Sequence, residues 1–236
     1  MPKEIDPKKV VILSGAGISA ESGIRTFRDS DGLWNEYAIS EVASPKGWDT
    51  NPQLVLDFYN QRRDDVRLAT PNLAHEAIAN LQNTYEVVVI TQNIDDLHER
   101  AGSEHVIHIH GEILKARSST NSSLVYELEN KNISIGEVCS EGSQLRPHIV
   151  WFGEKIMHDT QCREHLKTAG KVLIVGTSLS VYPAANLAKL ARYNAEKFLV
   201  GLDVDKKLFG YTYYREKATK AVPIICQGWI NGAKEI

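Results

Sequence analysis

The chain has 236 residues, of which 42% are hydrophobic, so it can bury one large core or a core with a small additional module. Its formal net charge is −3, from 27 basic and 30 acidic side chains, and Lys and Arg never run beyond adjacent pairs, so we expect no nucleic-acid partner. Three scattered cysteines fit no disulfide framework, and no apolar run approaches the ~20 residues of a membrane span, so we expect a soluble cytoplasmic protein with no membrane partner.

Short, β-branched apolar runs recur along the chain and predict buried strands. They lie at 9–14, 86–91, 106–110, 149–152, 172–176, 198–203 and 222–226. Helical patterns lie between many of these runs, at 52–69, 73–81, 94–101, 160–169 and 183–195. The alternation predicts an α/β fold, with a Rossmann-like parallel sheet covered by helices on both faces.

Two stretches break this alternation. Residues 29–50 show no strand pattern and lead into a helix, whereas residues 118–143 are rich in Ser, Asn and Glu. Both resemble insertions into the alternating sheet. We therefore expect 1–34, 75–115 and 144–236 to form the large Rossmann-like domain, and 35–74 with 116–143 to form a small insertion module.

A glycine-rich segment follows the first predicted strand. Residues 15–20 read Gly-Ala-Gly-Ile-Ser-Ala, which matches the fingerprint whose glycines let backbone N–H groups approach a pyrophosphate. A hydride-transfer dehydrogenase continues to a second strand and an acidic ribose-binding residue within ~30 residues. Here the next strand pattern begins at about Glu86, so hydride transfer is disfavoured. A tight strand-to-helix turn that binds nothing is the alternative for this segment.

Three further polar segments close predicted strands. They are Thr-Gln-Asn-Ile-Asp at 91–95, His-Gly at 110–111 and Gly-Thr-Ser at 176–178. Open α/β sheets bind ligands at the carboxyl ends of their strands, so these segments predict a nucleotide site. For Asn93 and Asp95 the alternative is capping of the helix that follows, because Asn and Asp are favoured N-caps.

These segments together resemble the sirtuin family. The matching blocks are 15–19, 22–28, 91–95, 110–111, 146–154 and 176–178, which occur in the family's order and span nearly the whole chain. The resemblance implies a Rossmann-type domain that binds NAD as a co-substrate, a small module from the two insertions, and a cleft between them for the acyl-lysine of a partner protein.

The resemblance also implies an activity, NAD-dependent deacylation of protein lysine, in which the acyl group moves to ADP-ribose and nicotinamide leaves. His110 is implied as the base that takes a ribose hydroxyl proton, which suits an imidazole titrating near ~6.5, and Asn93 as a second catalytic residue. The residues implied for NAD are Gly15, Ala16, Gly17, Ser19, Phe27, Arg28, Trp34, Gln92, Asn93, Ile94, Asp95, Gly176, Thr177, Ser178, Asp203, Val204, Asp205 and Ala218.

A second histidine, His108, lies two residues before His110 and shares its face if this segment is a strand. A His-x-His metal site is therefore an alternative for the pair, although the spacing shows no third ligand. The glycine after His110 matches the sirtuin block, which favours the base.

Tyr59 and Arg62 share a face of the helix predicted at 52–69. They resemble the Tyr-x-x-Arg signature of sirtuins that remove succinyl and malonyl groups, because a guanidinium binds a carboxylate through two parallel hydrogen bonds while a phenol adds a third. Ala43 matches a small residue that leaves room for the longer acyl chain. The alternative pairs Arg62 with Asp64 or Asp65 on a solvated face and packs Tyr59 in the core.

The segment 150–154 is implied as an edge strand that pairs with the backbone of the substrate. Its residues are Val150, Trp151, Phe152, Gly153 and Glu154.

The small module departs from the family pattern, in which two cysteine pairs hold a structural zinc. Residues 116–144 contain one cysteine, Cys139, and no histidine, and Ser118 and Ser119 stand where the first cysteines are expected. We therefore predict no zinc and no other metal. Apolar contacts are expected to hold the module instead, through Leu124, Val125, Tyr126, Leu128, Ile133 and Ile135.

Two other functions compete with deacylation. One is protein ADP-ribosyl transfer from the same pocket, and the other is a non-catalytic module that binds NAD or acyl-lysine. His110 and a channel with Tyr59 and Arg62 favour deacylation, because transfer to a protein nucleophile needs neither. The sequence does not indicate which oligomeric state the protein adopts.

Overall fold

The computed structural model describes residues 4–26, 33–34, 37–180, 182, 184–202 and 208–234. A six-stranded sheet in the order β11-β10-β9-β1-β4-β5 forms its centre, and every neighbouring pair runs parallel. The strands are β1 (Asp6–Ser14), β4 (Glu86–Thr91), β5 (Val106–His108), β9 (Ala169–Val175), β10 (Glu196–Val200) and β11 (Thr212–Tyr214). The predicted α/β class with a Rossmann-like parallel sheet is therefore confirmed.

The order of the strands creates a switch point in the middle of the sheet. From β1 the chain builds β4 and β5 on one side, then returns to build β9, β10 and β11 on the other. The connections that leave β1 and β9 therefore diverge at neighbouring carboxyl ends, which is where open α/β sheets bind ligands.

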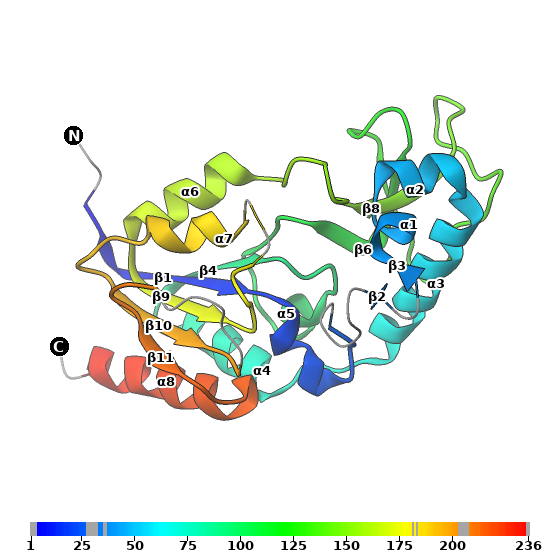
Figure 1. The fold of residues 1–236 in the computed structure, drawn as a ribbon. Coiled ribbons are helices and arrows are strands. Elements are labelled where there is room, and N and C mark those ends of the chain that lie inside the picture. Colours follow the sequence, from blue (N-terminus) through cyan, green and yellow to red (C-terminus); the bar gives the residue numbers. More distant parts are fainter. Residues whose placement is uncertain are drawn as a thin grey trace.

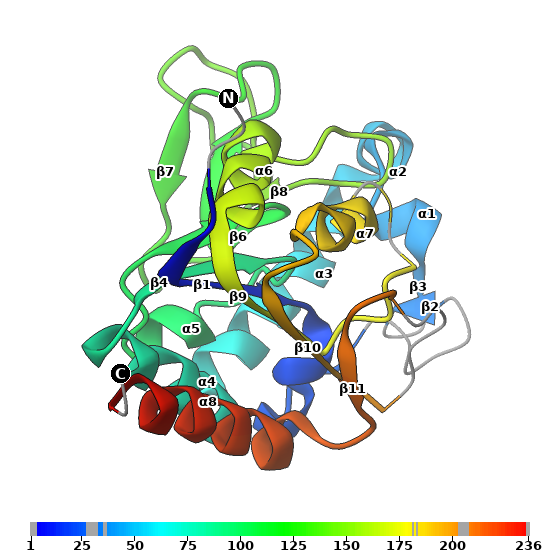
Figure 2. The same ribbon diagram turned by 90° about the vertical axis from the view of Figure 1, so that its left-hand side faces the viewer.

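Both faces of the sheet are buried, as period-two alternation along β1 shows. Val10 and Ile12 belong to one hydrophobic cluster, and Val11 and Leu13 belong to another. Helices α4 (Leu73–Asn80) and α8 (Ala218–Lys234) cover the first face, and α6 (Asp159–Thr168) and α7 (Ala184–Leu187) cover the second (Figure 1, Figure 2). Single-turn 3₁₀ segments lie at η1 (Ala16–Ile18), η2 (Ala20–Ser22), η3 (Leu81–Asn83) and η4 (Ala188–Leu190).

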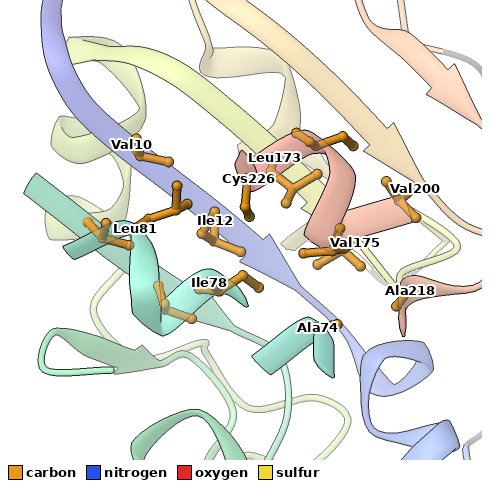
Figure 3. Packing of buried hydrophobic residues seen from close by; sticks show 14 of the residues in the cluster. Val10, Ile12, Ala74, Ile78, Leu81, Leu173, Val175, Val200, Ala218 and Cys226 are labelled. Atoms are coloured by element: carbon orange, nitrogen blue, oxygen red, sulfur yellow. The ribbon is translucent and has the colours of Figure 1, made fainter. Parts of the chain in front are cut away.

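The strand predicted at 222–226 is wrong, because these residues lie within α8. The apolar run there is also helical: Ala218, Val222, Cys226 and Trp229 recur at spacings of three or four and all are buried. Figure 3 shows Ala218 and Cys226 among the side chains of β1, β9 and α4. A short apolar run alone does not distinguish a buried strand from a buried helix.

A second group of elements lies beyond the carboxyl ends of the parallel strands (Figure 1). Its helices are α1 (Ile39–Val42), α2 (Pro45–Thr50) and α3 (Pro52–Leu68), and Leu97 of α5 (Leu97–Arg100) packs in one hydrophobic cluster with residues of α1 and α3. Its strands are β6 (Gly111–Ser118), β7 (Val125–Glu127) and β8 (Leu145–Ile149) in an antiparallel sheet ordered β7-β6-β8, with the two-residue strands β2 (Leu33–Trp34) and β3 (Tyr37–Ala38) paired nearby. This sheet takes in residues on both sides of the expected boundaries, and the division into two domains stays a prediction.

Apolar contacts hold the small group only in part. Leu128 and Ile133 are buried in a cluster with Leu56 and Ala116, as predicted. Val125 and Ile135 are 40% and 50% exposed, so the prediction that they pack is wrong. The strand β7 is an edge strand of its sheet, and most residues of the loop after it are exposed.

Polar side chains of α3 also hold the small group together, through hydrogen bonds to the loop after β7. Asn60 donates to the carbonyl oxygen of Ile133 and accepts from its N–H, at 2.9 and 3.1 Å. Arg67 donates to the carbonyl oxygens of Glu129 and Lys131, at 3.1 and 2.8 Å. One helix therefore holds the loop 128–133 by its main chain, which no apolar pattern predicts.

A cluster of hydroxyl groups lies where the zinc cysteines of the family were expected. Ser143 Oγ lies 2.7 Å from Ser118 Oγ and 3.1 Å from Cys139 Sγ, and it accepts from Thr120 at 3.0 Å. Ser118 Oγ also accepts from the N–H groups of Thr120 and Asn121. These bonds join the end of β6 to the segment just before β8. Within the described residues no three His, Cys, Asp or Glu side chains are grouped to hold an ion.

Among the described helices, none is both long enough and apolar enough to cross a membrane.

Candidate active site at the carboxyl ends of the parallel strands

The glycine loop lies at the switch point of the sheet. The N–H of Gly15 donates to the Val175 carbonyl at 3.0 Å, and that of Gly17 donates to the Gly176 carbonyl at 2.8 Å. A β-carbon on Gly17 would lie 2.8 Å from Gly176 Cα, and Gly176 itself has φ +65°, so both positions require glycine. Ala16 stays exposed at the outer surface of the loop. The loop is thus a thin, tightly packed floor that a phosphate group can approach.

A buried chain of hydrogen bonds joins the ends of β1 and β4 beneath this floor. Ser14 Oγ donates to Thr91 Oγ1 at 2.9 Å, and Thr91 Oγ1 accepts from the Asn93 N–H at 3.0 Å. His98 Nε2 lies 2.9 Å from Ser14 Oγ and must be the donor there, because the Ser14 proton is already used. Burial lowers the pKa of His98 well below its ordinary value, so the ring stays neutral.

Asn93 and Asp95 are both buried above this chain. Asn93 Nδ2 donates to Ser19 Oγ at 3.0 Å, while its Oδ1 has no hydrogen-bond partner among the described residues. Asp95 accepts from the Leu97 N–H at 3.2 Å, and burial raises the pKa of its carboxyl group. Asp95 therefore does part of the capping proposed as its alternative role, whereas Asn93 caps nothing. A buried acceptor without a partner costs ~1–3 kcal/mol and fits a ligand that donates to it.

Gln92 and Thr177 bridge the strands on either side of β1. Gln92 Nε2 donates to Thr177 Oγ1 at 3.1 Å, and its N–H donates to the Ser14 carbonyl at 2.9 Å. Ser178 Oγ lies 2.6 Å from Ser180 Oγ. The predicted segments 91–95 and 176–178 thus meet at one place.

His110 is partly buried and lies beside Gln92 at the same strand ends. Its Nδ1 lies 3.0 Å from the Gln92 carbonyl oxygen, which can only accept, so Nδ1 carries the proton and the neutral ring has its lone pair on Nε2. Burial lowers the pKa of His110, against the opposing effect of the Gln92 carbonyl. Gly111 follows with φ +86° and lies against the His148 backbone, where a β-carbon would clash. His110 is therefore a neutral base at neutral pH.

The residues predicted for the acyl pocket lie close to one another, on α3 and at the end of α1, near the segment after β8. Tyr59 is fully buried and its hydroxyl accepts from Trp151 Nε1 at 3.1 Å. Arg62 is 5% exposed and donates to the Arg25 carbonyl at 3.2 Å, so it does not lie on a solvated helix face as the alternative required. Ala43 is buried in the same cluster as Tyr59. Burial lowers the pKa of Arg62 and raises that of Tyr59.

The segment 150–154 is a turn, so the expected edge strand is wrong. The strand β8 ends at Ile149, and Gly153 has φ +93°. The Glu154 carboxylate accepts from the Trp151 N–H at 2.7 Å and from Arg146 at 2.9 Å, which closes the turn. Phe152 N–H donates to the Ala43 carbonyl, and Val150 N–H donates to that of His110. These main-chain donors are therefore used inside the protein, while the Phe152 side chain is 49% exposed.

The remaining predicted residues are placed as follows. Ala218 begins α8 and is buried, and the Ile94 carbonyl accepts from the Ile113 N–H at 2.8 Å. Trp34 is described only as part of β2. Five predictions fall outside the described residues, namely Phe27, Arg28, Asp203, Val204 and Asp205.

Sequence reasoning missed the residues that support the site. Ser14 and His98 were not singled out, because Ser14 is one polar residue at the end of an apolar run and His98 is one of several polar residues in the charged segment 95–100. Arg146 lies with its Cζ 3.2 Å from the centroid of the Trp151 ring and holds Glu154. A positive and a negative residue eight positions apart around a tryptophan give only a weak signal, since the turn that brings them together depends on Gly153.

Known proteins match the chain closely. The Sir2 family model matches residues 15–183. An NAD-dependent protein deacylase of Helicobacter pylori (strain ATCC 700392 / 26695) is 55% identical over 188 residues, which cover 80% of this chain and 82% of that protein. An NAD-dependent protein deacylase of Vibrio parahaemolyticus (serotype O3:K6, strain RIMD 2210633) is 44% identical over 231 residues, 92% of each chain.

Solved structures agree with these matches. A Sir2 homolog in complex with NAD superimposes with a TM-score of 0.85 and 36% identity, over 96% of this chain and 91% of that one. A Sir2 homologue in complex with ADP-ribose gives a TM-score of 0.83 and 35% identity, over 96% and 94%. The chain belongs to the Sir2 family, the sirtuins, as the resemblance of its motifs predicted.

Proposed function

We propose that this protein is an NAD-dependent protein lysine deacylase that prefers acidic acyl groups, succinyl and malonyl. Two groups at the same strand ends carry the proposal. His110 is neutral with its lone pair on Nε2, and the buried Asn93 Oδ1 has no hydrogen-bond partner among the described residues. The deacylase names of relatives that are 44–55% identical support the activity.

The site residues fit NAD. Glycines at 15, 17 and 176 keep the loop free of side chains beside the strand ends, and Asn93 Oδ1 accepts from an amide or hydroxyl donor. When bound, NAD supplies the ADP-ribose unit that receives the acyl group, and nicotinamide leaves. Thr177 and Ser178 are proposed to contact ribose and phosphate hydroxyl or oxygen atoms, with Gln92 held beside them by its bond to Thr177.

His110 is proposed to remove the proton of a ribose hydroxyl at Nε2. The Gln92 carbonyl fixes the tautomer, and burial keeps the ring unprotonated before the step. A positioned base of this kind contributes about 10²- to 10⁴-fold to the rate. Burial of Asn93, Asp95 and Ser19 around the reacting centre also keeps water from it, which protects an acyl transfer from hydrolysis.

The acyl preference rests on Tyr59 and Arg62. A succinyl or malonyl chain ends in a carboxylate, and a guanidinium in a buried pocket binds that group through two charge-assisted hydrogen bonds. Arg62 is buried beside Tyr59, and the charge of each affects the pKa of the other. An acetyl group offers neither the charge nor the length to reach them. Acyl-lysine proteins are accordingly the proposed partners.

The test compares three acyl groups on one peptide. The protein is incubated with NAD and matched acetyl-, malonyl- and succinyl-lysine peptides, and peptide mass and nicotinamide release are followed together. We expect succinyl and malonyl to be lost faster than acetyl. The variant Arg62→Met should reverse this order, whereas Gln61→Met, on the exposed face of the same helix, should not.

Three results would decide against parts of the proposal. Faster loss of acetyl in the unmodified protein would remove the acidic-acyl preference. If NAD labelled in its ADP-ribose part is used, transfer of the label to protein without any change in peptide mass would favour the ADP-ribosyltransferase. Binding of NAD without nicotinamide release would favour the non-catalytic module.

A further inference from the structure

His108 makes two contacts that the proposed chemistry does not use. It is the last residue of β5, two positions before His110, and is 7% exposed. Its Nδ1 lies 3.0 Å from the carbonyl oxygen of Asn93, and its Nε2 lies 2.7 Å from Glu99 Oε1. Glu99 belongs to α5, the helix that follows the 92–96 loop.

These contacts fix the charge of His108. A carbonyl oxygen and a carboxylate both only accept, so each ring nitrogen must carry a proton and the ring is an imidazolium. Burial alone would lower the pKa of His108, but the hydrogen bond and charge of Glu99 and the Asn93 carbonyl outweigh it and raise the pKa. Burial alone would raise the pKa of Glu99, and the His108 contact reverses this as well. Neither nitrogen of the imidazolium has a lone pair for a metal, which disfavours the His-x-His site.

The two histidines hold consecutive carbonyls of one loop. His110 Nδ1 donates to Gln92 and His108 Nδ1 donates to Asn93, each at 3.0 Å. Both rings therefore reach the same loop, although β5 ends at His108 and a bend follows it. The main chain that carries the Asn93 amide is therefore tied to the segment that carries the base, by the base itself and by His108, which the proposed chemistry does not use.

We propose that Glu99 and His108 form a positioning dyad, which fixes the Asn93 main chain relative to His110 and so aligns the two groups for acyl transfer. The inference rests on the proposed function and extends it to two residues outside the reacting centre. A misplacement of about 1 Å at such a centre costs up to ~100-fold in rate.

The dyad also has an electrostatic effect on its surroundings. The His108 charge opposes the rise in the pKa of Asp95 that burial causes, so it favours the ionised carboxylate in the site. Other charged or titratable groups face the dyad from α5, β6, the start of β5 and the turn before α6. They are His98, Glu112, Lys115, His105 and His158.

Two pairs of variants distinguish a positioning role of His108 and Glu99 from a general effect on folding. His108→Asn keeps an amide donor near the place of Nδ1 for the Asn93 carbonyl, whereas His108→Leu removes it. Glu99→Gln keeps a hydrogen-bond partner for Nε2 without charge, whereas Glu99→Ala removes it. Glu196→Gln is the control, because its 2.6 Å ion pair with Lys171 lies at the other end of the parallel strands.

We expect His108→Leu and Glu99→Ala to lower kcat by about 10- to 100-fold with little change in the KM for peptide. The conservative variants His108→Asn and Glu99→Gln should recover most of kcat, and the control should match the unmodified protein. Equal kcat for His108→Leu and the control would overturn the inference, as would an equal loss in Glu99→Gln and Glu99→Ala.

The pH profile gives a readout that a structural role would not move. The pKa of His108 is raised, so the second ring proton is present below that pKa and is lost as the pH rises through it, which leaves one acceptor without a donor. We expect an alkaline fall in kcat that Glu99→Gln flattens, because its dyad is neutral throughout. An identical alkaline limb in both proteins would count against the dyad.

Side-chain ¹⁵N spectra of His108 test the dyad even without turnover. Two protonated ring nitrogens at neutral pH in the unmodified protein support the dyad, and a neutral ring would overturn it. Failure of every acylated peptide to react would instead contradict the proposed function, and the ring spectrum would still support or overturn the dyad by itself.

Discussion

The hydroxyl of Tyr59 accepts a hydrogen bond from the indole of Trp151. That tryptophan is held in turn, because the Arg146 guanidinium stacks on its ring and Glu154 accepts from its backbone N–H. Glu154 also accepts from Arg117, so three charged side chains hold the turn that carries Trp151. The position of Tyr59, which we propose to help select the acyl group, therefore depends on Trp151 and on the charged residues that hold Trp151.

The variant Trp151→Phe tests this dependence. It removes the indole donor to Tyr59 and keeps an aromatic ring for Arg146. We expect the KM for a succinyl peptide to rise, because the phenol is no longer oriented toward the carboxylate, while the KM for an acetyl peptide changes less. Steady-state kinetics on the two peptides provide the measurement, and equal changes in both KM values would show that the bond does not serve selectivity.

At the scale of elements, the parallel strands follow from their apolar runs and the antiparallel sheet does not. Segments such as 86–91 are buried on both faces and therefore read as continuous apolar sequence. The strand β6 mixes glycine, charged and apolar residues, and its position depends on partners far along the chain. The turn at 150–154 was missed for the same reason, since Glu154 closes it with Arg146 and Arg117.

The candidate site shows the same division. The glycine loop was predicted from its short motif, because close backbone approach at the strand ends requires glycine. Asn93 and His110 were predicted from short motifs that resemble the sirtuin blocks. The dyad partner Glu99 and the supporting Ser14 and His98 could not be, since single polar residues become meaningful only when folding brings their partners within reach.

The attachment of α3 to the loop 128–133 predicts a specific loss of stability. In Asn60→Ala the Ile133 N–H and carbonyl both lose their partner. A buried donor or acceptor that has lost its hydrogen-bond partner costs about 1–3 kcal/mol, so we expect the free energy of unfolding in urea to fall by about that amount. Asn83→Ala, which removes an exposed bond to Asn80, is the matched control and should change it little.

The serine cluster predicts that chelators have no effect. Ser118, Ser143 and Cys139 satisfy one another and leave no four-ligand set. We expect EDTA or a stronger zinc chelator to change neither Tm nor deacylation, and elemental analysis to find no zinc. One tightly bound zinc ion per chain, lost together with activity, would contradict this view of the module.

At the scale of the whole molecule, the switch point of the sheet gathers groups that are far apart in the chain. The loop at 15–17, the amides at 92–93, His110 and the segment 176–178 come from four separate connections and meet where β1 and β9 diverge (Figure 1). The small group of elements contributes Ala43, Tyr59 and Arg62, the residues proposed for the acyl pocket. The proposed site therefore draws on both groups of elements, in keeping with matching blocks that span nearly the whole chain.

The pH dependence of the proposed step belongs to this scale, because it depends on how deeply the fold buries His110. Burial lowers the pKa of His110 below the ordinary imidazole value of 6.5. The neutral base is lost only as the pH falls through that lowered pKa. We therefore expect the acid limb of acyl transfer to have its midpoint below pH 6.5 and to be missing in any His110 variant.

The most direct test of the central claim is single-turnover transfer from a succinyl-lysine peptide in the presence of NAD, for the unmodified protein and for His110→Asn. The asparagine keeps a donor for the Gln92 carbonyl but cannot accept the proton. The account predicts that the unmodified protein releases nicotinamide and converts the peptide to free lysine, and that His110→Asn slows the conversion by about 10²- to 10⁴-fold while still binding NAD. Conversion at an undiminished rate in His110→Asn would contradict it.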